Sequence, residues 1–214
     1  MNNSSINYIV STFILLLSIL LFSFADTDKK VIKDFRLLNV NGKMVSLKDY
    51  PKAKGFIIVF TCNHCPFAKL YPERMNKLNT KYTPLGIPLI AISSTDTITY
   101  EEDCYKRMVI KAKAEKFNFP YLFDGLQTTG INFGAEKTPH AFIIWKENSE
   151  WVIKYKGAID DNGKEPDKVV NHYAEMAADA LLKGNPVPIN NTKSLGCQIH
   201  YRNAPDINPD YKHK

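Results

Sequence analysis

Hydrophobic positions in the first part of the chain alternate or run continuously, which predicts β-strands. Two short alternating runs, 34–40 and 43–47, flank the dipeptide Asn41-Gly42. Alternation around Asn-Gly is typical of a tight β-hairpin. The continuous apolar runs Gly55–Phe60 and 88–93 indicate strands that are covered on both faces.

Apolar residues recur at helical spacing in three longer segments. The first is 65–82, in which Pro72 predicts a kink. The second is 99–116, which opens with a capping box at 99–102. The third is 166–182, which stops before Gly184.

The remaining segments complete an alternating order of strands and helices. Residues 120–123 predict a short strand, 127–133 a helical turn, and 141–145 with 151–157 an antiparallel pair. This order predicts an α/β protein with a central mixed sheet, helices on both faces and an added N-terminal hairpin. Strands joined by crossover helices should be parallel.

Residues 8–25 form an 18-residue run without a charge, which ends in Ser23-Phe24-Ala25 with the small residues that a signal peptidase prefers at its cleavage site. We interpret residues 1–25 as a signal peptide, with an N-terminal membrane anchor as the alternative. Either interpretation predicts an exported protein, periplasmic or otherwise extracytoplasmic. The domain is expected at 31–184, followed by a tail at 185–214.

Charge and cysteine content narrow the function further. The formal net charge is +6 and the basic residues are scattered, so nucleic acid is not an expected partner. Four cysteines are too few to staple an exported domain of this size, so its core must come from apolar packing.

The stretch Phe-Thr-Cys-Asn-His-Cys-Pro at 60–66 holds the candidate chemistry, because Cys62 and Cys65 lie at a strand-to-helix junction. A helix N-terminus stabilises a thiolate, which is the form that exchanges disulfides. We expect Cys62 to be the nucleophile and Cys65 the resolving thiol. A protonated His64 would stabilise the thiolate and make the disulfide more oxidising; the alternative is an exposed loop histidine. Zinc is not favoured, since no second close Cys or His pair is present. An inert disulfide is not favoured either, because the pair lies at a strand-to-helix junction.

Several motifs together resemble the thioredoxin superfamily, and more narrowly its exported redoxin-type members. They are 60–66, Lys-Thr-Pro-His at 137–140, Lys-Gly-Ala-Ile-Asp-Asp-Asn at 156–162 and Thr-Lys-Ser-Leu-Gly-Cys at 192–197. The resemblance implies a thioredoxin-like fold in which the dithiol faces a cis-proline loop, here Thr138-Pro139. Asn63 departs from the residues that are usual between the two cysteines.

A thiol-dependent peroxidase is the alternative activity, because peroxiredoxins share this resemblance. Their pattern places a proline and a threonine before the reactive cysteine and an arginine later. Here Ile58 and Cys62 stand at the first two positions, and no arginine occurs between Arg107 and Arg202. A non-catalytic binding module with the same fold is a third hypothesis.

Three further residues are candidates for supporting roles. Cys104 is interpreted as a buried thiol on a helix. Cys197 is either a third redox thiol or the partner of Cys104 in a disulfide. Asp160 follows the last strand and would either assist proton transfer at Cys65 or cap a turn. The expected function is thiol-disulfide exchange without a cofactor or metal, with thiol or disulfide substrates and a redox partner protein.

Overall fold

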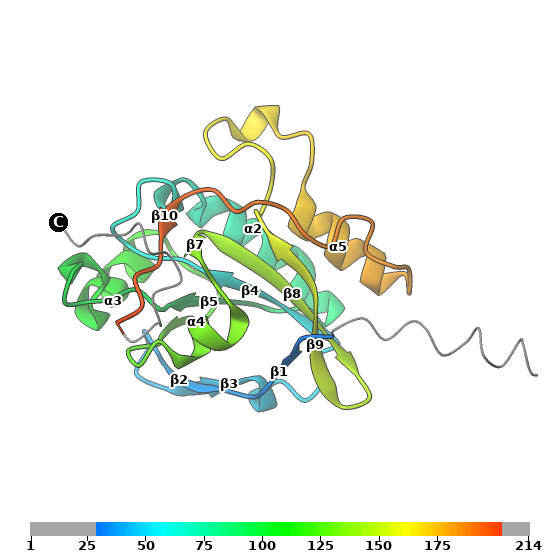
Figure 1. Cartoon of the computed structure of the whole chain (residues 1–214), viewed down its shortest axis with the longest axis horizontal. Helices are drawn as coiled ribbons and strands as arrows, with labels where there is room; N and C mark the ends of the chain where they lie inside the picture. Colours follow the sequence, from blue (N-terminus) through cyan, green and yellow to red (C-terminus); the bar gives the residue numbers. More distant parts are fainter. Residues whose placement is uncertain (1–28, 203–214) are drawn as a thin grey trace, which may run out of the picture. The chain divides into compact units, whose positions relative to one another are not determined.

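The computed structural model describes residues 29–202. Its centre is a mixed sheet of eight strands (Figure 1). Its order is β1-β9-β8-β4-β5-β6-β2-β3. The bounds are β1 (Val31–Ile32), β2 (Arg36–Asn39), β3 (Met44–Ser46), β4 (Gly55–Phe60), β5 (Leu89–Ser93), β6 (Tyr121–Phe123), β8 (His140–Glu147) and β9 (Glu150–Gly157). A second, two-stranded sheet pairs β7 (Lys137–Thr138) with β10 (Cys197–Gln198). The segment 1–25 lies outside the described residues.

Strand directions follow the order expected from the sequence. β4 pairs in parallel with β5, and β5 with β6, across the two helical connections. β8 and β9 form the expected antiparallel pair. The hairpin β2–β3 joins the sheet through β6, and the short β1, which the sequence patterns do not indicate, pairs with β9 at the opposite edge.

Helices cover both faces of the sheet, as the fold class requires. They are α2 (Pro72–Tyr82), α3 (Tyr105–Ala114), α4 (Thr128–Phe133) and α5 (Tyr173–Leu182). The helices α2, α3 and α5 pack on one face, where Ile57 and Val59 of β4 point. Phe56, Ile58 and Phe60 of the same strand point to the other face and pack near α4. This alternation explains why β4 is apolar throughout.

Two helices begin later than predicted, each after a short 3₁₀ turn. Pro72 is the first residue of α2, where its missing N–H costs nothing, so it opens the helix instead of kinking it. A short 3₁₀ turn, Ala68–Leu70, precedes it. The third predicted helix is likewise divided into a 3₁₀ turn, Pro166–Lys168, and α5.

The second predicted helix also starts later, since the capping box at 99–102 does not form. The Thr99 hydroxyl donates to Asp96 Oδ2 at 2.8 Å, and a 3₁₀ turn, Glu101–Asp103, intervenes. Cys104 then has an extended backbone and serves as the N-cap of α3. It is half-buried and sits before the helix, so its predicted place on a buried helical face is wrong.

Within residues 29–202 no helix has both the length and the apolar character needed to cross a membrane.

Candidate active site

The two cysteines of the loop after β4 meet the loop before β8. Cys62 Sγ lies 3.0 Å from Thr138 Oγ1, and Cys65 Sγ lies 3.2 Å from the Thr138 carbonyl oxygen. The Thr138-Pro139 peptide bond is cis, as the family resemblance implies. Pairing of Phe60 with His140 aligns β4 and β8, so the segments that leave their ends must meet. The sequence motifs at 60–66 and 137–140 thus form one site.

The two thiols influence each other's titration. The pKa of Cys65 is lowered, first by the hydrogen bond from Cys62 and then by the Cys197 thiol and the backbone N–H groups of Ala68 and Cys197. The pKa of Cys62 is raised by its bond to Cys65, by burial and by the charge of Asp103. This order is the reverse of the lowered Cys62 pKa expected from the sequence. The reason is that α2 starts at Pro72, so single N–H groups near Cys65 replace the expected helix terminus at Cys62.

His64 is held by a buried carboxylate and does not lie in an open loop. Its Nδ1 is 2.5 Å from Asp103 Oδ2, and its ring stacks on Tyr100 with centroids 3.9 Å apart. Asp103 is 0% exposed and also accepts hydrogen bonds from the backbone N–H groups of Asn63 and His64. The interpretation of His64 as an exposed loop residue is therefore wrong. Its effect on the thiols must be considered together with Asp103.

Asn63, which is an unusual residue between the two cysteines, makes two side-chain hydrogen bonds. Its amide donates to the Glu102 carbonyl oxygen at 2.6 Å, and its side-chain oxygen accepts from the Tyr121 hydroxyl at 3.1 Å. Lys111 Nζ donates to the Cys62 carbonyl oxygen at 3.2 Å. The loop is thus fixed by polar side chains from α3, β6 and the turn before α3.

Cys197 lies against the dithiol and not against Cys104. Its backbone N–H donates to Cys65 Sγ at 3.2 Å, and burial together with Cys65 raises the pKa of the Cys197 thiol to about 11. All four cysteines are free. A neutral Cys197 thiol can therefore donate to the Cys65 thiolate. This arrangement supports a third redox thiol over the alternative disulfide with Cys104.

Asp160 has other partners than the cysteines. It accepts hydrogen bonds from Arg74 Nη1 at 2.6 Å and from the Tyr71 hydroxyl at 3.1 Å. Arg74 also donates to the carbonyl oxygens of Asn162 and Gly163. In the described residues Asp160 therefore ties α2 to the loop after β9, and proton transfer at Cys65 gains no support.

Sulfur, nitrogen and oxygen atoms of Cys62, His64 and Asp103 lie within 4.8 Å of one another, a spacing that could hold a metal ion. However, each oxygen of Asp103 already accepts a hydrogen bond, so a cation would have to displace the ring of His64. The cluster is better described as the hydrogen-bonded support of the loop.

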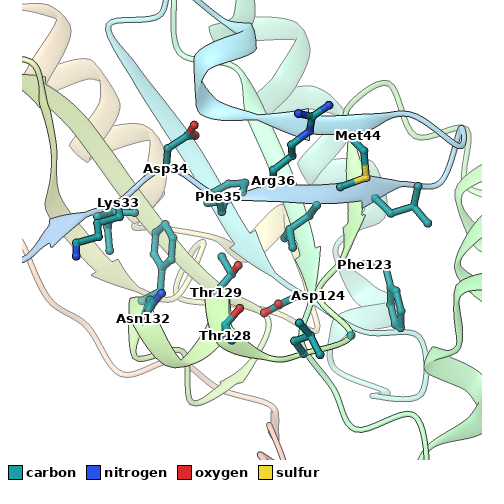
Figure 2. A pocket seen from close by; sticks show the side chains of 16 residues that line it. Lys33, Asp34, Phe35, Arg36, Met44, Phe123, Asp124, Thr128, Thr129 and Asn132 are labelled. Carbon is teal, nitrogen blue, oxygen red and sulfur yellow. The ribbon is translucent and has the colours of Figure 1, made fainter.

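A cavity of about 560 Å³ lies elsewhere, between the hairpin and the segment 123–133 (Figure 2). Phe35, Met44 and Phe123 supply apolar walls, and Asp124 is buried beside them. Burial raises the pKa of Asp124, whose Oδ2 accepts from Ser94 and from the Gly130 N–H. None of the four cysteines lines this cavity.

The fold and the dithiol beside a cis-proline loop define a thioredoxin-like redox protein. Residues 29–161 match the AhpC/TSA family, and the chain belongs to this family. The thiol-disulfide oxidoreductase ResA of Bacillus thuringiensis is 24% identical over 164 residues, which cover 75% of this chain and 82% of ResA.

Two solved structures are also similar. An uncharacterized conserved protein from Geobacillus kaustophilus has 33% identity and a TM-score of 0.74 over 83% of this chain and 93% of that chain. An exposed lipoprotein thioredoxin of Streptococcus pneumoniae shares the fold, with 17% identity and a TM-score of 0.53 over 71% of this chain and 99% of its own. The fold and the reaction class expected from the sequence, thiol-disulfide exchange by a thioredoxin-like enzyme, are confirmed.

Sequence reasoning did not find Asp103, Lys111 or Tyr121. Asp103 stands in the acidic run Glu101-Glu102-Asp103, which looks like an ordinary solvated helix start. Its distance of about 40 residues from the cysteines carries no periodic signal. Asn63 was the one hint in the sequence that other polar residues support the loop, because a buried amide side chain needs hydrogen-bond partners.

Proposed function

We propose that Cys62 and Cys65 are the redox couple of this oxidoreductase. The observation that carries this proposal is the meeting of two adjacent buried thiols with the cis-proline loop, where Thr138 contacts both sulfurs. In the reducing direction, a thiolate attacks a substrate disulfide and forms a mixed disulfide. The second thiol then attacks that bond and leaves a Cys62–Cys65 disulfide, while the substrate gains two electrons and two protons.

Roles within the couple are assigned as follows. The lowered pKa of Cys65 favours its thiolate in the reduced site, while the assignment of Cys62 as attacking thiol stays a prediction from its place at the strand-to-helix junction. Thr138 contacts both sulfurs and Pro139 shapes the loop. Cys197 is a candidate third redox thiol: its thiolate would attack Cys65 in the Cys62–Cys65 disulfide, forming Cys65–Cys197 and releasing the Cys62 thiolate, with no net change in electrons.

The test compares turnover of a disulfide-linked fluorescent peptide by the wild type and single cysteine variants. Cys62→Ser and Cys65→Ser should each lose turnover by about a hundredfold or more, as expected when a nucleophile is removed. Cys104→Ser, which changes a half-buried thiol at the start of α3, is the matched control and should retain activity. Full activity in both dithiol variants would refute the proposal.

A peroxidase reaction is the second candidate, and one contact favours it. The Thr138 hydroxyl lies 3.0 Å from Cys62 Sγ, so a hydroxyl is present beside a thiol although the sequence pattern lacks one. Two arginines are held by other groups: Arg74 pairs with Asp160, and Arg202 donates to the Gly125 carbonyl oxygen. Slow labelling by a dimedone-type probe after stoichiometric peroxide, in Cys62→Ser and Cys65→Ser, would agree with exchange as the main activity. Complete labelling within seconds would favour the peroxidase.

Export is proposed on the uncharged run 8–25, with cleavage before Asp26. Thiol or disulfide compounds and a redox partner protein outside the cytoplasm would then be the reaction partners. N-terminal sequencing of the exported protein tests this. Retention of Met1 would instead favour the membrane anchor.

A further inference from the structure

The C-terminal segment lies along the sheet edge that faces the dithiol. β10 pairs antiparallel with β7, with Cys197 opposite Thr138 and Gln198 opposite Lys137 (Figure 1). The Ile199 N–H extends this pairing by donating to the Glu136 carbonyl oxygen at 2.8 Å. The tail therefore uses the edge of β7 through its main chain, as an added peptide strand would.

Close approach at this edge requires glycine before the cysteine. Gly196 has a φ of +141°, which residues with a side chain rarely adopt. A Cβ atom added there would collide with the Thr138 carbonyl oxygen. The main chain of the tail therefore passes directly over the residue that contacts both thiols.

Covering by the tail closes the site to other molecules. Cys62 and Cys65 are both 0% exposed, while Cys197 is half-buried. Disulfide exchange requires a partner sulfur to approach the attacking thiolate directly. Along the edge of β7, Gly196 and Cys197 occupy the positions from which a partner's main chain would reach Cys65.

The ends of this covering segment are held independently of the dithiol. At one end the Thr192 hydroxyl accepts from the Ala158 N–H at 3.0 Å. At the other, Ile199 is buried in the apolar core and the Tyr201 hydroxyl donates to the Ala135 carbonyl oxygen at 2.7 Å. Residues 193–198 therefore form a tethered bridge, whose attachment gives it a high local concentration at the site.

We propose that residues 196–198, which cover the dithiol, are a built-in occupant of the edge of β7 that an extended, cysteine-bearing polypeptide must displace. Cys197 takes the place of the partner's cysteine, and the partner must displace the bridge. The proposal rests on the proposed role of the Cys62–Cys65 couple. It adds the kind of partner, an unfolded or extended chain with a small residue before its cysteine, and the internal competitor that limits its access.

Docking of the tail is linked to the redox state of the couple. The Cys197 N–H donates to Cys65 Sγ at 3.2 Å, and such a bond is strongest when the sulfur is a thiolate, which exists only in the reduced protein. By linkage, the reduced protein holds the tail more tightly than the disulfide form does. Oxidation therefore loosens the bridge, which opens the edge to a dithiol partner.

The test uses the full chain and the variant Gly196→Ala, whose added methyl group excludes the bridge from the edge. Gly184→Ala is the matched control, because Gly184 also has a positive φ of +72° but no atom lies within 4 Å of an added Cβ. The readout is the rate at which iodoacetamide modifies Cys62 and Cys65, followed by mass spectrometry of their peptides. Gly196→Ala should raise this rate by about tenfold or more, and Gly184→Ala should leave it within about twofold.

A synthetic peptide of residues 192–202 with Cys197→Ser tests docking itself. Added in excess, it should slow alkylation of the Gly196→Ala chain, whereas the same peptide with Gly196→Ala should not. Equal effects of the two peptides would overturn the docking site. Unchanged alkylation of the folded Gly196→Ala chain would overturn the internal occupant.

Ile199→Ala serves as a second variant in case Gly196→Ala does not fold, since it loosens one end of the bridge without touching the dithiol. It should raise the alkylation rate in the same direction, and an unchanged rate would count against the proposal. Alkylation measures access and not turnover. If these results hold but no disulfide substrate is turned over, the proposed function fails while the docking site stands.

Discussion

The loop that carries Cys62 and Cys65 and the segment that carries Cys197 meet at one sulfur, yet they are held in different ways. The loop is fixed by buried side chains, with Asp103 accepting hydrogen bonds from two of its backbone N–H groups. The tail is fixed by a two-residue strand pair and by anchors outside it. A buried polar network is costly to break, whereas main-chain pairing at an edge can be exchanged for another strand. The difference teaches that the loop is the permanent part of the site and the tail the replaceable one.

The largest expected effect is a pH dependence that only the reduced protein shows. The folded pKa of Cys65 is lowered from the value of an unfolded thiol, which is about 8.5. The unfolded state binds more protons between these values, so the stability of the reduced protein rises with pH through this window and is lost as pH falls toward the folded pKa. The slope approaches about 1.4 kcal/mol per pH unit.

Urea unfolding at several pH values from about 5 to about 8 measures this pH dependence. The reduced and the disulfide forms are compared. Cys65→Ser is the control, and its reduced form should lose the slope. Parallel curves for the two redox forms of the wild type would contradict a Cys65 thiolate.

Asp103→Ala should weaken the permanent part of the site most. It leaves two backbone N–H groups and the ring of His64 without their acceptor, so the free energy of unfolding should fall by about 3 kcal/mol. Asp167→Ala, at an exposed carboxylate in the 3₁₀ turn before α5, should change it by less than about 0.5 kcal/mol. Equal effects of the two substitutions would mean that Asp103 does not support the loop.

Ile199→Ala should weaken the replaceable part. Ile199 is 4% exposed and anchors the tail in the apolar core, so truncation should cost about 2 kcal/mol of local stability. Hydrogen exchange of the tail amides should accelerate by about thirtyfold, with a smaller change in β4. Leu195→Ala, at an exposed side chain of the same segment, is the control. Uniform acceleration across the sheet would show that tail and loop open together.

His64→Ala should have the smallest effect on stability, about 1.5 kcal/mol, from loss of its bond to Asp103 and its stacking on Tyr100. It leaves the Asp103 carboxylate uncompensated beside the dithiol, which disfavours the thiolate and makes the disulfide harder to reduce. Each ~1.4 kcal/mol shifts a two-electron couple by about 30 mV. Equilibration with glutathione measures this shift, and an unchanged potential would remove His64 from the electrostatics of the couple.

The sequence by itself determined the order of the main strands and helices, the parallel pairing of β4, β5 and β6, the antiparallel pairing of β8 with β9, and the place of the dithiol. These follow from local patterns, because apolar runs, an Asn-Gly turn and two cysteines at a strand end act over a few residues. The encounter of 60–66 with 137–140 was also predictable, through the family resemblance.

Only the tertiary structure decided which thiol holds the charge and what covers it. Asp103 and Cys197 approach the dithiol from about 40 and about 130 residues away along the chain. The helices α2 and α3 also start later than the spacing of apolar residues predicts. Pro72 opens α2, and the bond from the Thr99 hydroxyl to Asp96 replaces the predicted capping box before α3. Electrostatic and hydrogen-bonding partners act through space, so a pattern that is read along the chain cannot show them.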